Sequence, residues 1–419
     1  MNILAELQQR NLIQDISDPE LFDKLKPGEA FYVGFDPTAP SLQLGNLVPL
    51  TMSMRLAKAG YKPILLFGGF TGAIGDPSGK ANERQLLDQE AINTNVSNHQ
   101  KCVKQIFERA KLDVKFVNNT EWCANLTTLE FLRDVGKHFT VNYMLSKEVV
   151  KTRVEGAGIS FTEFSYMILQ SFDFLNLYKT YNCKLQIGGS DQWGNLTAGL
   201  ELIRKKIQGE AFAFSIPLIT DSQGKKFGKS ESGTIWLDAA QSSPYKFHQF
   251  WLNLPDSDVV KYLKIFSFFS LEEIAELEKS LLTAPEKRAA QNALADCMCS
   301  LVHGEEATQD ARKSAQVLFG GSIDGLSSGQ LADIFEDAPS SSLEKSKLET
   351  LSFLDLLVES KLAKSKGEAR RLVESGGAYL NNQRISDVNL KLSEASCLDS
   401  EMLVLRSGKK NYHILKVLK

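Results

Sequence analysis

The sequence predicts an α/β protein in which a doubly wound parallel sheet is followed by an α-helical domain and a small α+β domain. Three observations lead to this prediction. An apolar strand, a turn, an apolar-periodic helix and a second apolar strand follow one another between residues 30 and 69. Residues 244–319 repeat Leu, Ile, Phe and Ala at helical spacing. The chain beyond residue 348 reads as two short helices and then strands, and it is markedly basic.

The first strand–helix–strand unit predicts both the sheet and a ligand site. Residues 30–35 read as a buried strand, residues 36–41 break it, and an apolar helix runs from Leu42 to about Gly60. The next strand occupies residues 63–69. In doubly wound sheets, ligands bind at the carboxyl ends of strands, beside helix N-termini. We therefore expect a ligand near the turn that follows the first strand.

A lysine-rich loop is the second candidate for ligand binding. Residues 226–230 read Lys-Phe-Gly-Lys-Ser and follow a turn-rich run at 220–224. Such a loop can fold two ammonium groups over a polyphosphate. A lysine-rich loop by itself is more often simply solvated, and the strand–turn–helix unit is what favours the binding interpretation.

Together these segments resemble the class I aminoacyl-tRNA synthetases. Residues 32–46 lie where that class carries its His-x-Gly-His signature, and residues 226–230 lie where it carries Lys-Met-Ser-Lys-Ser. The run Gly-Gly-Ser-Asp-Gln-Trp-Gly-Asn at 188–195 narrows the resemblance to the tyrosyl/tryptophanyl branch. The run Phe-Thr-Glu-Phe-Ser-Tyr at 161–166, with Gln170 and Asp173, narrows the resemblance further, to the bacterial tyrosyl-tRNA synthetases. The motifs occur in the family's order over almost the whole chain.

The resemblance implies a domain organisation and a reaction. We expect a Rossmann-like catalytic domain over residues 1–235, an α-helical anticodon-side domain over 236–320, a linker over 321–347 and a ribosomal-protein-type RNA-binding domain over 348–419. The implied activity is the activation of tyrosine with ATP, followed by transfer of tyrosine to tRNA. Expected partners are tRNA, tyrosine, ATP and a second copy of the chain. Residues 131–144 read equally as part of a homodimer interface or as a buried helix.

Composition excludes several other classes of protein. With 419 residues, 43% hydrophobic and 24% charged, the chain is an ordinary globular one with room for two or three domains. No apolar run approaches the roughly 18 residues that span a bilayer, and the N-terminus does not resemble a signal peptide. We expect a cytoplasmic location without membrane association. The six cysteines lack metal-ligand spacing, so neither a metal site nor a tightly bound cofactor is expected, although ATP would arrive with Mg²⁺.

The resemblance also implies which residues meet the phosphates of ATP, where positive and hydrogen-bonding groups stabilise developing charge. The first signature departs from the family because Gln43 and Asn46 replace its two histidines. Each amide can donate the hydrogen bond of the histidine that it replaces, but neither can become a cation. If the first histidine acts as a cation in the family, the change costs roughly 1–3 kcal/mol of transition-state stabilisation. The implied catalytic residues are Thr38, Gln43, Lys80, Arg84, Lys226, Lys229 and Ser230.

Two further sets of residues are implied to bind the substrates. A tyrosine pocket needs a polar pair at its apolar end to meet the phenol hydroxyl, and Tyr32 with Asp173 matches the family's pair. The residues implied to bind tyrosine are Tyr32, Asp76, Tyr166, Gln170, Asp173 and Gln186. The residues implied to bind ATP or the adenylate are Gly34, Asp36, Gly45, Asn46, Gly189, Asp191, Gln192 and Lys229.

The tail of the chain carries a separate basic signature. Residues 361–419 hold 12 Lys and Arg against 6 Asp and Glu, a charge of +6 in a chain whose total is −3. A basic tail on an acidic body suggests contact with nucleic acid, although a basic helix exposed to solvent would give the same pattern. The candidate RNA-binding residues are Lys364, Lys366, Arg370 and Arg371.

Two other functions stay open from the sequence. The chain could be a catalytically weak RNA-binding protein that kept the fold, which the replaced histidines favour slightly. The Tyr32–Asp173 pair and the loop lysines oppose it, because a protein that only binds RNA needs neither. A tryptophanyl relative fits poorly, because an indole offers no hydroxyl for that pair.

Overall fold

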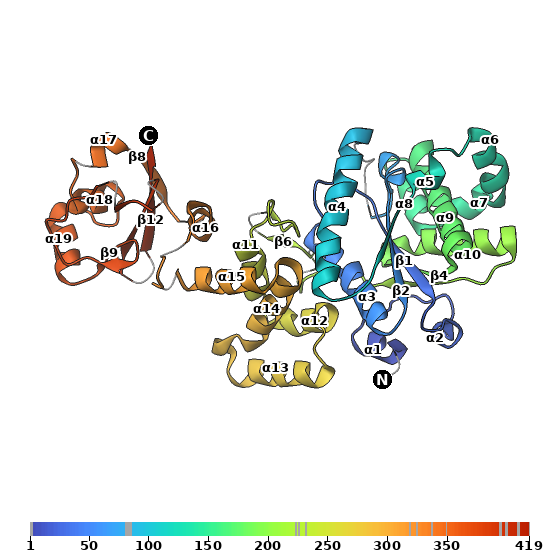
Figure 1. Cartoon of the computed structure of the whole chain (residues 1–419), viewed down its shortest axis with the longest axis horizontal. Helices are drawn as coiled ribbons and strands as arrows, with labels where there is room; N and C mark the ends of the chain where they lie inside the picture. Colours follow the sequence, from blue (N-terminus) through green and yellow to red (C-terminus); the bar gives the residue numbers. More distant parts are fainter. Residues whose placement is uncertain are drawn as a thin grey trace. The chain divides into compact units, whose positions relative to one another are not determined.

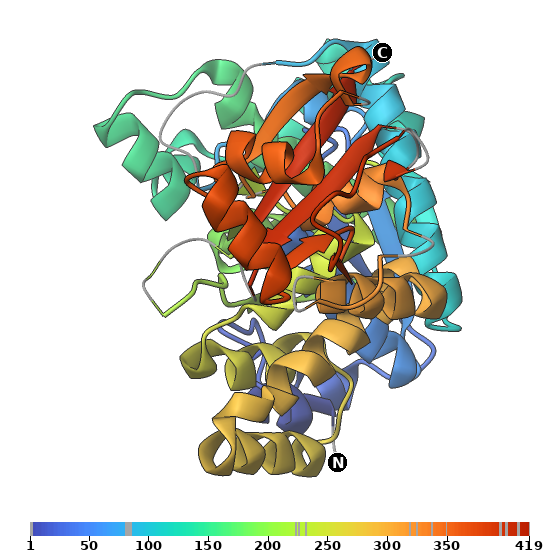
Figure 2. The ribbon, with the colours of Figure 1, turned by 90° about the vertical axis from the view of Figure 1, so that its left-hand side faces the viewer.

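The computed structural model describes residues 3–79, 86–222, 224, 227–230, 233–317, 320–323, 326–336, 338–348, 350–393, 396–398, 401–408 and 411–418. The chain divides into two compact units (Figures 1 and 2). The first comprises Met1–Gln241 and Trp251–Val302, and the second comprises Ser242–Phe250 and His303–Lys419. No helix within the described ranges is long and apolar enough to cross a membrane.

A five-stranded parallel sheet forms the centre of the first unit, in the order β3–β2–β1–β4–β5. Its strands are apolar because helices cover both faces. Helices α3 and α4 lie on one side of the sheet and α9 and α10 on the other (Figure 1). This arrangement confirms the predicted doubly wound α/β fold. The strands are β1 Ala30–Phe35, β2 Lys62–Phe67, β3 Lys115–Asn118, β4 Cys183–Gly189 and β5 Phe212–Ile216.

Several helices of this unit begin at polar caps that the sequence supplies. Asp88 accepts a hydrogen bond from Ala91 N at the start of α4, and Ser160 accepts one from Glu163 N at the start of α9. The helices up to residue 207 are α1 Ile3–Gln9, α2 Leu21–Lys24, α3 Leu47–Lys58, α4 Gln89–Arg109, α5 Thr120–Cys123, α6 Thr128–Glu130, α7 Val141–Leu145, α8 Glu148–Glu155, α9 Phe161–Tyr181 and α10 Trp193–Ile207. Short turns are η1 Leu44–Asn46, η2 Thr71–Ala73, η3 Phe131–Val135, η4 Gly136–His138 and η5 Ser190–Gln192.

The chain beyond β5 becomes helical, as predicted. A small hairpin, β6 Lys229–Ser230 and β7 Gly233–Thr234, precedes the helices. The helices are α11 Pro244–Leu252, α12 Asp256–Phe266, α13 Leu271–Thr283, η6 Pro285–Lys287, α14 Ala289–His303 and α15 Glu305–Val317. A capping box between Ser270 and Glu273 starts α13.

The second unit contains a small α+β domain with a five-stranded sheet in the order β10–β9–β11–β12–β8. All neighbours pair antiparallel except β8, which runs parallel to β12. Leu356, Leu403 and Leu405 lie in the core between the sheet and its helices. The elements are α16 Ser328–Ile334, β8 Ser340–Glu344, α17 Lys345–Leu348, α18 Phe353–Glu359, α19 Lys366–Glu374, β9 Ala378–Leu380, β10 Gln383–Arg384, β11 Met402–Ser407 and β12 Asn411–Leu418.

The segment 321–347, predicted to be a linker, differs from that expectation because it contains α16, β8 and most of α17. Its Ser-rich composition is typical of linkers, but Ser340–Glu344 pairs with β12 as an edge strand. Three serines of this strand are exposed and Leu343 is buried, so a single apolar residue marks it as a strand. The other domain boundaries remain predictions.

Candidate active site

The predicted ligand residues of the first unit gather at the carboxyl ends of β1 and β4. The strand order reverses between these two strands, and ligands of doubly wound sheets bind at such a point. The end of β1 carries Gly34 and is followed by Asp36, while β4 ends at Gly189, two residues before Asp191. A Cβ on Gly189 would lie 2.6 Å from Asp191 Oδ1, so a larger residue there would displace the Asp191 carboxylate from its present position.

A buried polar pair lies beneath this edge of the sheet. Asp173 on α9 accepts hydrogen bonds from Trp122 Nε1 at 2.7 Å and from Asn119 Nδ2 at 3.0 Å. Burial raises the pKa of Asp173 to about 7, although these hydrogen bonds oppose the rise. Tyr32 is 1% exposed, and its hydroxyl lacks a hydrogen-bond partner within the described structure. Burial, together with the Asp173 charge, raises the pKa of Tyr32 well above its ordinary value, so the phenol stays protonated.

A hydrogen-bond network connects this pair to the end of β1. Tyr166 donates from its hydroxyl to Asp36 Oδ2 at 2.7 Å, which leaves the Tyr166 oxygen able to accept. Thr71 Oγ1 donates to the other carboxylate oxygen of Asp36 at 2.9 Å. Asn119 Nδ2 donates to Thr71 Oγ1 at 2.9 Å, in addition to its bond with Asp173. The network therefore fixes the carboxylates of Asp36 and Asp173 relative to each other.

A second network brings together three more predicted residues. Gln192 Nε2 donates to Asp76 Oδ2 at 2.6 Å, and Asn195 Nδ2 donates to Gln192 Oε1 at 3.1 Å and to Gln170 Oε1 at 3.0 Å. Gln186 is 2% exposed, and its side-chain oxygen lacks a hydrogen-bond partner within the described ranges. The buried and half-buried amides and the Asp76 carboxylate offer acceptors at fixed positions for a cationic group such as an ammonium.

Four residues of these networks, Thr71, Asn119, Trp122 and Asn195, were not among the predicted site residues. Thr71 and Asn119 follow the carboxyl ends of β2 and β3, and this position on neighbouring strands was a signal in the sequence. Asn195 ends the run at 188–195 that carried the resemblance, so a signal for it was also present. Trp122 lies on the short helix α5, where a single residue has no distinguishing pattern.

The two phosphate-binding candidate segments contact each other. Leu44 N donates to Ile235 O at 2.9 Å, so the chain just after the lysine-rich loop packs along the start of η1. Gly228 has a φ of +93°, and its Cβ would lie 3.3 Å from Leu44 Cβ. Asn46 Oδ1 accepts from Gln43 N at 2.8 Å, and this bond uses the amide oxygen rather than the Nδ2 donor. Gln43, Gly45 and Thr38 are exposed.

Several predicted residues lie wholly or partly beyond the described structure. Lys80, Arg84 and Lys226 lie outside the described residues, and only the backbone of Lys229 and Ser230 is described. Among the residues that are described, no group of His, Cys, Asp and Glu could hold a metal ion.

The four basic candidates of the tail lie on or just before α19 and are exposed. They are not equivalent. Lys366 Nζ lies 2.5 Å from Asp355 Oδ1, and this hydrogen bond lowers the pKa of Asp355 to about 2. Asp355 therefore offsets the Lys366 charge at neutral pH. Lys364, Arg370 and Arg371 have no ion pair within the described residues.

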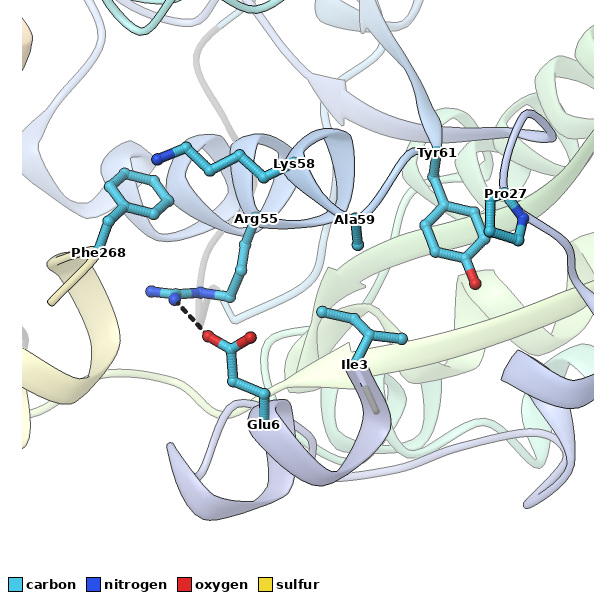
Figure 3. Close-up of a pocket in the computed structure, with 8 residues that line it drawn as sticks. All are labelled: Ile3, Glu6, Pro27, Arg55, Lys58, Ala59, Tyr61 and Phe268. Carbon is cyan, nitrogen blue, oxygen red and sulfur yellow. Dashed lines mark hydrogen bonds and ion pairs between the residues drawn. The ribbon is translucent and has the colours of Figure 1, made fainter. Parts of the chain in front are cut away.

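A cavity of about 470 Å³ lies at the other end of α3 and shares no residue with this site (Figure 3). Arg55, which is 4% exposed, forms an ion pair with Glu6 at 2.9 Å there and also donates to Ser267 O. This contact ties α1 to α3 and to the end of α12. The lining residues are Ile3, Glu6, Pro27, Arg55, Lys58, Ala59, Tyr61 and Phe268.

Comparison with known proteins gives concordant results for both units. Residues 27–320 match the family model of class I tRNA synthetases (W and Y), and residues 330–415 match the model of the tyrosine–tRNA ligase SYY-like C-terminal domain. The chain is 49% identical to tyrosine–tRNA ligase 1 of Bacillus anthracis, with 99% of this chain and 100% of the relative covered. It is 47% identical to the tyrosine–tRNA ligase of Roseiflexus castenholzii, with 99% of each chain covered. The crystal structure of a C-terminally truncated mitochondrial tyrosyl-tRNA synthetase from Aspergillus nidulans matches with a TM-score of 0.69 at 29% identity, covering 76% of this chain and 94% of that one.

Proposed function

The chain belongs to the tyrosine–tRNA ligase family of class I tRNA synthetases, and we propose that the site at the ends of β1 and β4 carries out both steps of tRNA charging. In the first step a carboxylate oxygen of tyrosine attacks the α-phosphorus of ATP, and the bond to the β-phosphate breaks to release pyrophosphate. In the second step a ribose hydroxyl at the 3′ end of tRNA attacks the acyl carbon, and AMP leaves.

The buried pair of Tyr32 and Asp173 supports tyrosine as the substrate, and it is the observation that carries the proposal. The Tyr32 hydroxyl can donate to the phenol oxygen of the substrate while ionised Asp173 accepts the phenol proton. Trp122 and Asn119 hold the Asp173 carboxylate in place for this contact. Phenylalanine would leave the Tyr32 hydroxyl buried without a partner and would give Asp173 no phenol proton to accept, which is costly.

The ammonium and ATP would occupy the edge above this pair. Tyr166, Gln170 and Asp76 supply acceptors for the ammonium, with Gln186 as a further wall of the pocket. The ATP-binding set comprises Gly34, Asp36, Gly45, Asn46, Gly189, Asp191 and Gln192. Thr38, Gln43, Ser230 and the cations Lys80, Arg84, Lys226 and Lys229 would meet the phosphates, whose charge Mg²⁺ carried by ATP would also offset.

The remaining parts of the chain would serve tRNA and assembly. In this proposal residues 1–235 perform catalysis, residues 236–320 face the anticodon side of tRNA, and residues 348–419 bind RNA through the basic face of α19. A protein that charges tRNA would work in the cytoplasm. Of the ten large apolar side chains exposed in the described structure, six lie between residues 129 and 161, and we assign this apolar surface to a homodimer interface.

Tyrosine-dependent exchange of pyrophosphate into ATP tests the function, with phenylalanine and tryptophan as control substrates. Exchange with tyrosine alone is the expected result, and Tyr32→Phe should reduce the preference for tyrosine over phenylalanine. Folded protein that binds tRNA but gives no exchange would instead favour an RNA-binding protein that kept the fold.

A further inference from the structure

The turn between β1 and η1 depends on side chains from α4 for its shape. Prolines at positions 37 and 40 remove two N–H groups from this turn, so it cannot form a regular backbone ladder. Thr38 N donates to Asp36 O at 2.9 Å, a bond that closes only the first part of the turn. The carbonyls that follow therefore need donors from elsewhere in the fold.

One face of α4 supplies those donors. Asn95 Nδ2 donates to Pro37 O at 3.0 Å, and His99 Nε2 lies 2.8 Å from Ala39 O. A spacing of four residues places both side chains on the same side of the helix. Because a carbonyl oxygen can only accept, His99 must carry its proton on Nε2. Burial lowers the pKa of His99, which keeps the ring neutral with a single N–H.

These two contacts are buried and lie on either side of one residue. Asn95 is 7% exposed and His99 is 2% exposed, so water does not compete for either bond. They hold the carbonyls of residues 37 and 39, and the exposed Thr38 lies between them. A third bond, from Asn98 Nδ2 to Pro40 O, is 3.4 Å long and solvent-exposed, and it should contribute little.

We propose that Asn95 and His99 are positioning residues that hold Thr38 at the place where it meets the phosphates of ATP. The inference rests on the proposed function, because the role of Thr38 belongs to it. A helix anchored on the sheet thus fixes a turn that has few backbone hydrogen bonds of its own. A displacement of about 1 Å at a reacting group can cost on the order of 10²-fold in rate.

Steady-state pyrophosphate exchange by the full chain tests the inference. His99→Leu removes the donor, and we expect kcat to fall by about tenfold or more while KM for tyrosine is unchanged. In His99→Gln the amide nitrogen reaches about as far as Nε2, and this variant should keep kcat within about threefold of the unsubstituted chain. Asn98→Ala is the matched control on the same helix face and should leave kcat nearly unchanged.

A double-mutant cycle with Thr38→Ala separates positioning from general stability. If His99 acts through Thr38, His99→Leu should have no further effect on kcat in the Thr38→Ala background. Additive losses, or a His99→Leu variant with full kcat, would overturn the inference. If His99→Leu does not fold, Asn95→Ala takes its place in the same cycle. It too should lower kcat alone and have no further effect on kcat in the Thr38→Ala background. Failure of the unsubstituted chain to catalyse exchange would instead count against the proposed function.

Discussion

Asp173 illustrates how the surroundings of one side chain set its chemistry. Burial favours the neutral acid and raises its pKa to about 7, while bonds from Asn119 and Trp122 favour the carboxylate. The resemblance in the sequence paired Asp173 with Tyr32. The place of Asn119 after a strand marked it only as a site candidate, and no pattern pointed to Trp122. Partners of this kind come from segments far apart in the chain, so only the folded structure identifies them.

The pKa of Asp173 predicts a pH-dependent affinity for tyrosine. Only the ionised carboxylate accepts the phenol proton, so affinity should be low at pH 5.5, rise through about pH 7 and level off above it. Asp173→Asn should bind weakly at every pH, because its amide cannot ionise. Calorimetric titration with tyrosine between pH 5.5 and 8.5 measures this. An affinity that does not change with pH in the unsubstituted chain would contradict the assigned role of Asp173.

The proposed role of Gln43 predicts that replacing this residue slows the chemical step and leaves substrate binding unchanged. In the proposed function Gln43 donates to the phosphates as a neutral group, and it should then stabilise the transition state more than the bound ground state. Gln43→Ala should therefore lower kcat for pyrophosphate exchange by roughly 5- to 150-fold, equivalent to about 1–3 kcal/mol. KM for tyrosine should not change. A rise in that KM with kcat preserved would show that Gln43 acts in tyrosine binding instead.

At the scale of elements, the first βαβ unit was predictable and the edge strand of the tail was not. Residues 30–35 form β1 as predicted, because an apolar run buried on both faces has a clear pattern. The helix predicted from Leu42 is in fact η1 followed by α3, since residues 44–46 form a 3₁₀ turn before the α-helix begins. Strand β8 was not predicted because its serines resemble a linker.

Packing of the lysine-rich loop on η1 predicts that Gly228 is required for activity. Its φ of +93° is strained for any side chain, and an added Cβ would press on Leu44 and Gly45. We expect Gly228→Ala to cost about 1–2 kcal/mol locally and to disturb the loop that the proposed function assigns to the phosphates. Pyrophosphate exchange should then fall in kcat. Gly224→Ala is the control, because Gly224 also has positive φ but its Cβ would meet nothing within 4 Å.

Helix α19 predicts unequal contributions from its basic residues to tRNA affinity. Arg370 and Arg371 are exposed, whereas Asp355 already offsets the charge of Lys366. Arg370→Gln or Arg371→Gln should reduce the slope of log K against log salt by about 0.7–0.9 for each phosphate that is no longer neutralised. Lys366→Gln should change it less. Filter binding of tRNA across a salt series measures these slopes. If every variant has the same slope as the unsubstituted chain, tRNA does not bind at α19.

On the scale of the whole molecule, the uneven charge and the apolar surface indicate separate roles for its parts. The basic excess lies in the last 59 residues, at positions 361–419, and the rest of the chain is acidic. The sequence left the apolar surface undecided, because most of its residues lie on short helices whose faces cannot be assigned from spacing. The segment 131–144, for which an interface and a buried helix were both open, contributes the exposed Leu132 and Val141.

The homodimer assignment predicts that charges placed in this surface will dissociate the protein. Leu129 and Phe161 are 68% and 74% exposed and occupy the first turns of α6 and α9. Aspartate is favourable in a first turn, so Leu129→Asp and Phe161→Asp should not weaken the helices themselves. In an interface each would bury an unpaired charge at a cost of several kcal/mol. Sedimentation equilibrium should show a dimer for the unsubstituted chain and a monomer for the double variant. Leu282→Asp is the matched control, since Leu282 is 81% exposed on α13, outside this surface, and should leave the dimer intact. A double variant that stays dimeric would place the interface on another face.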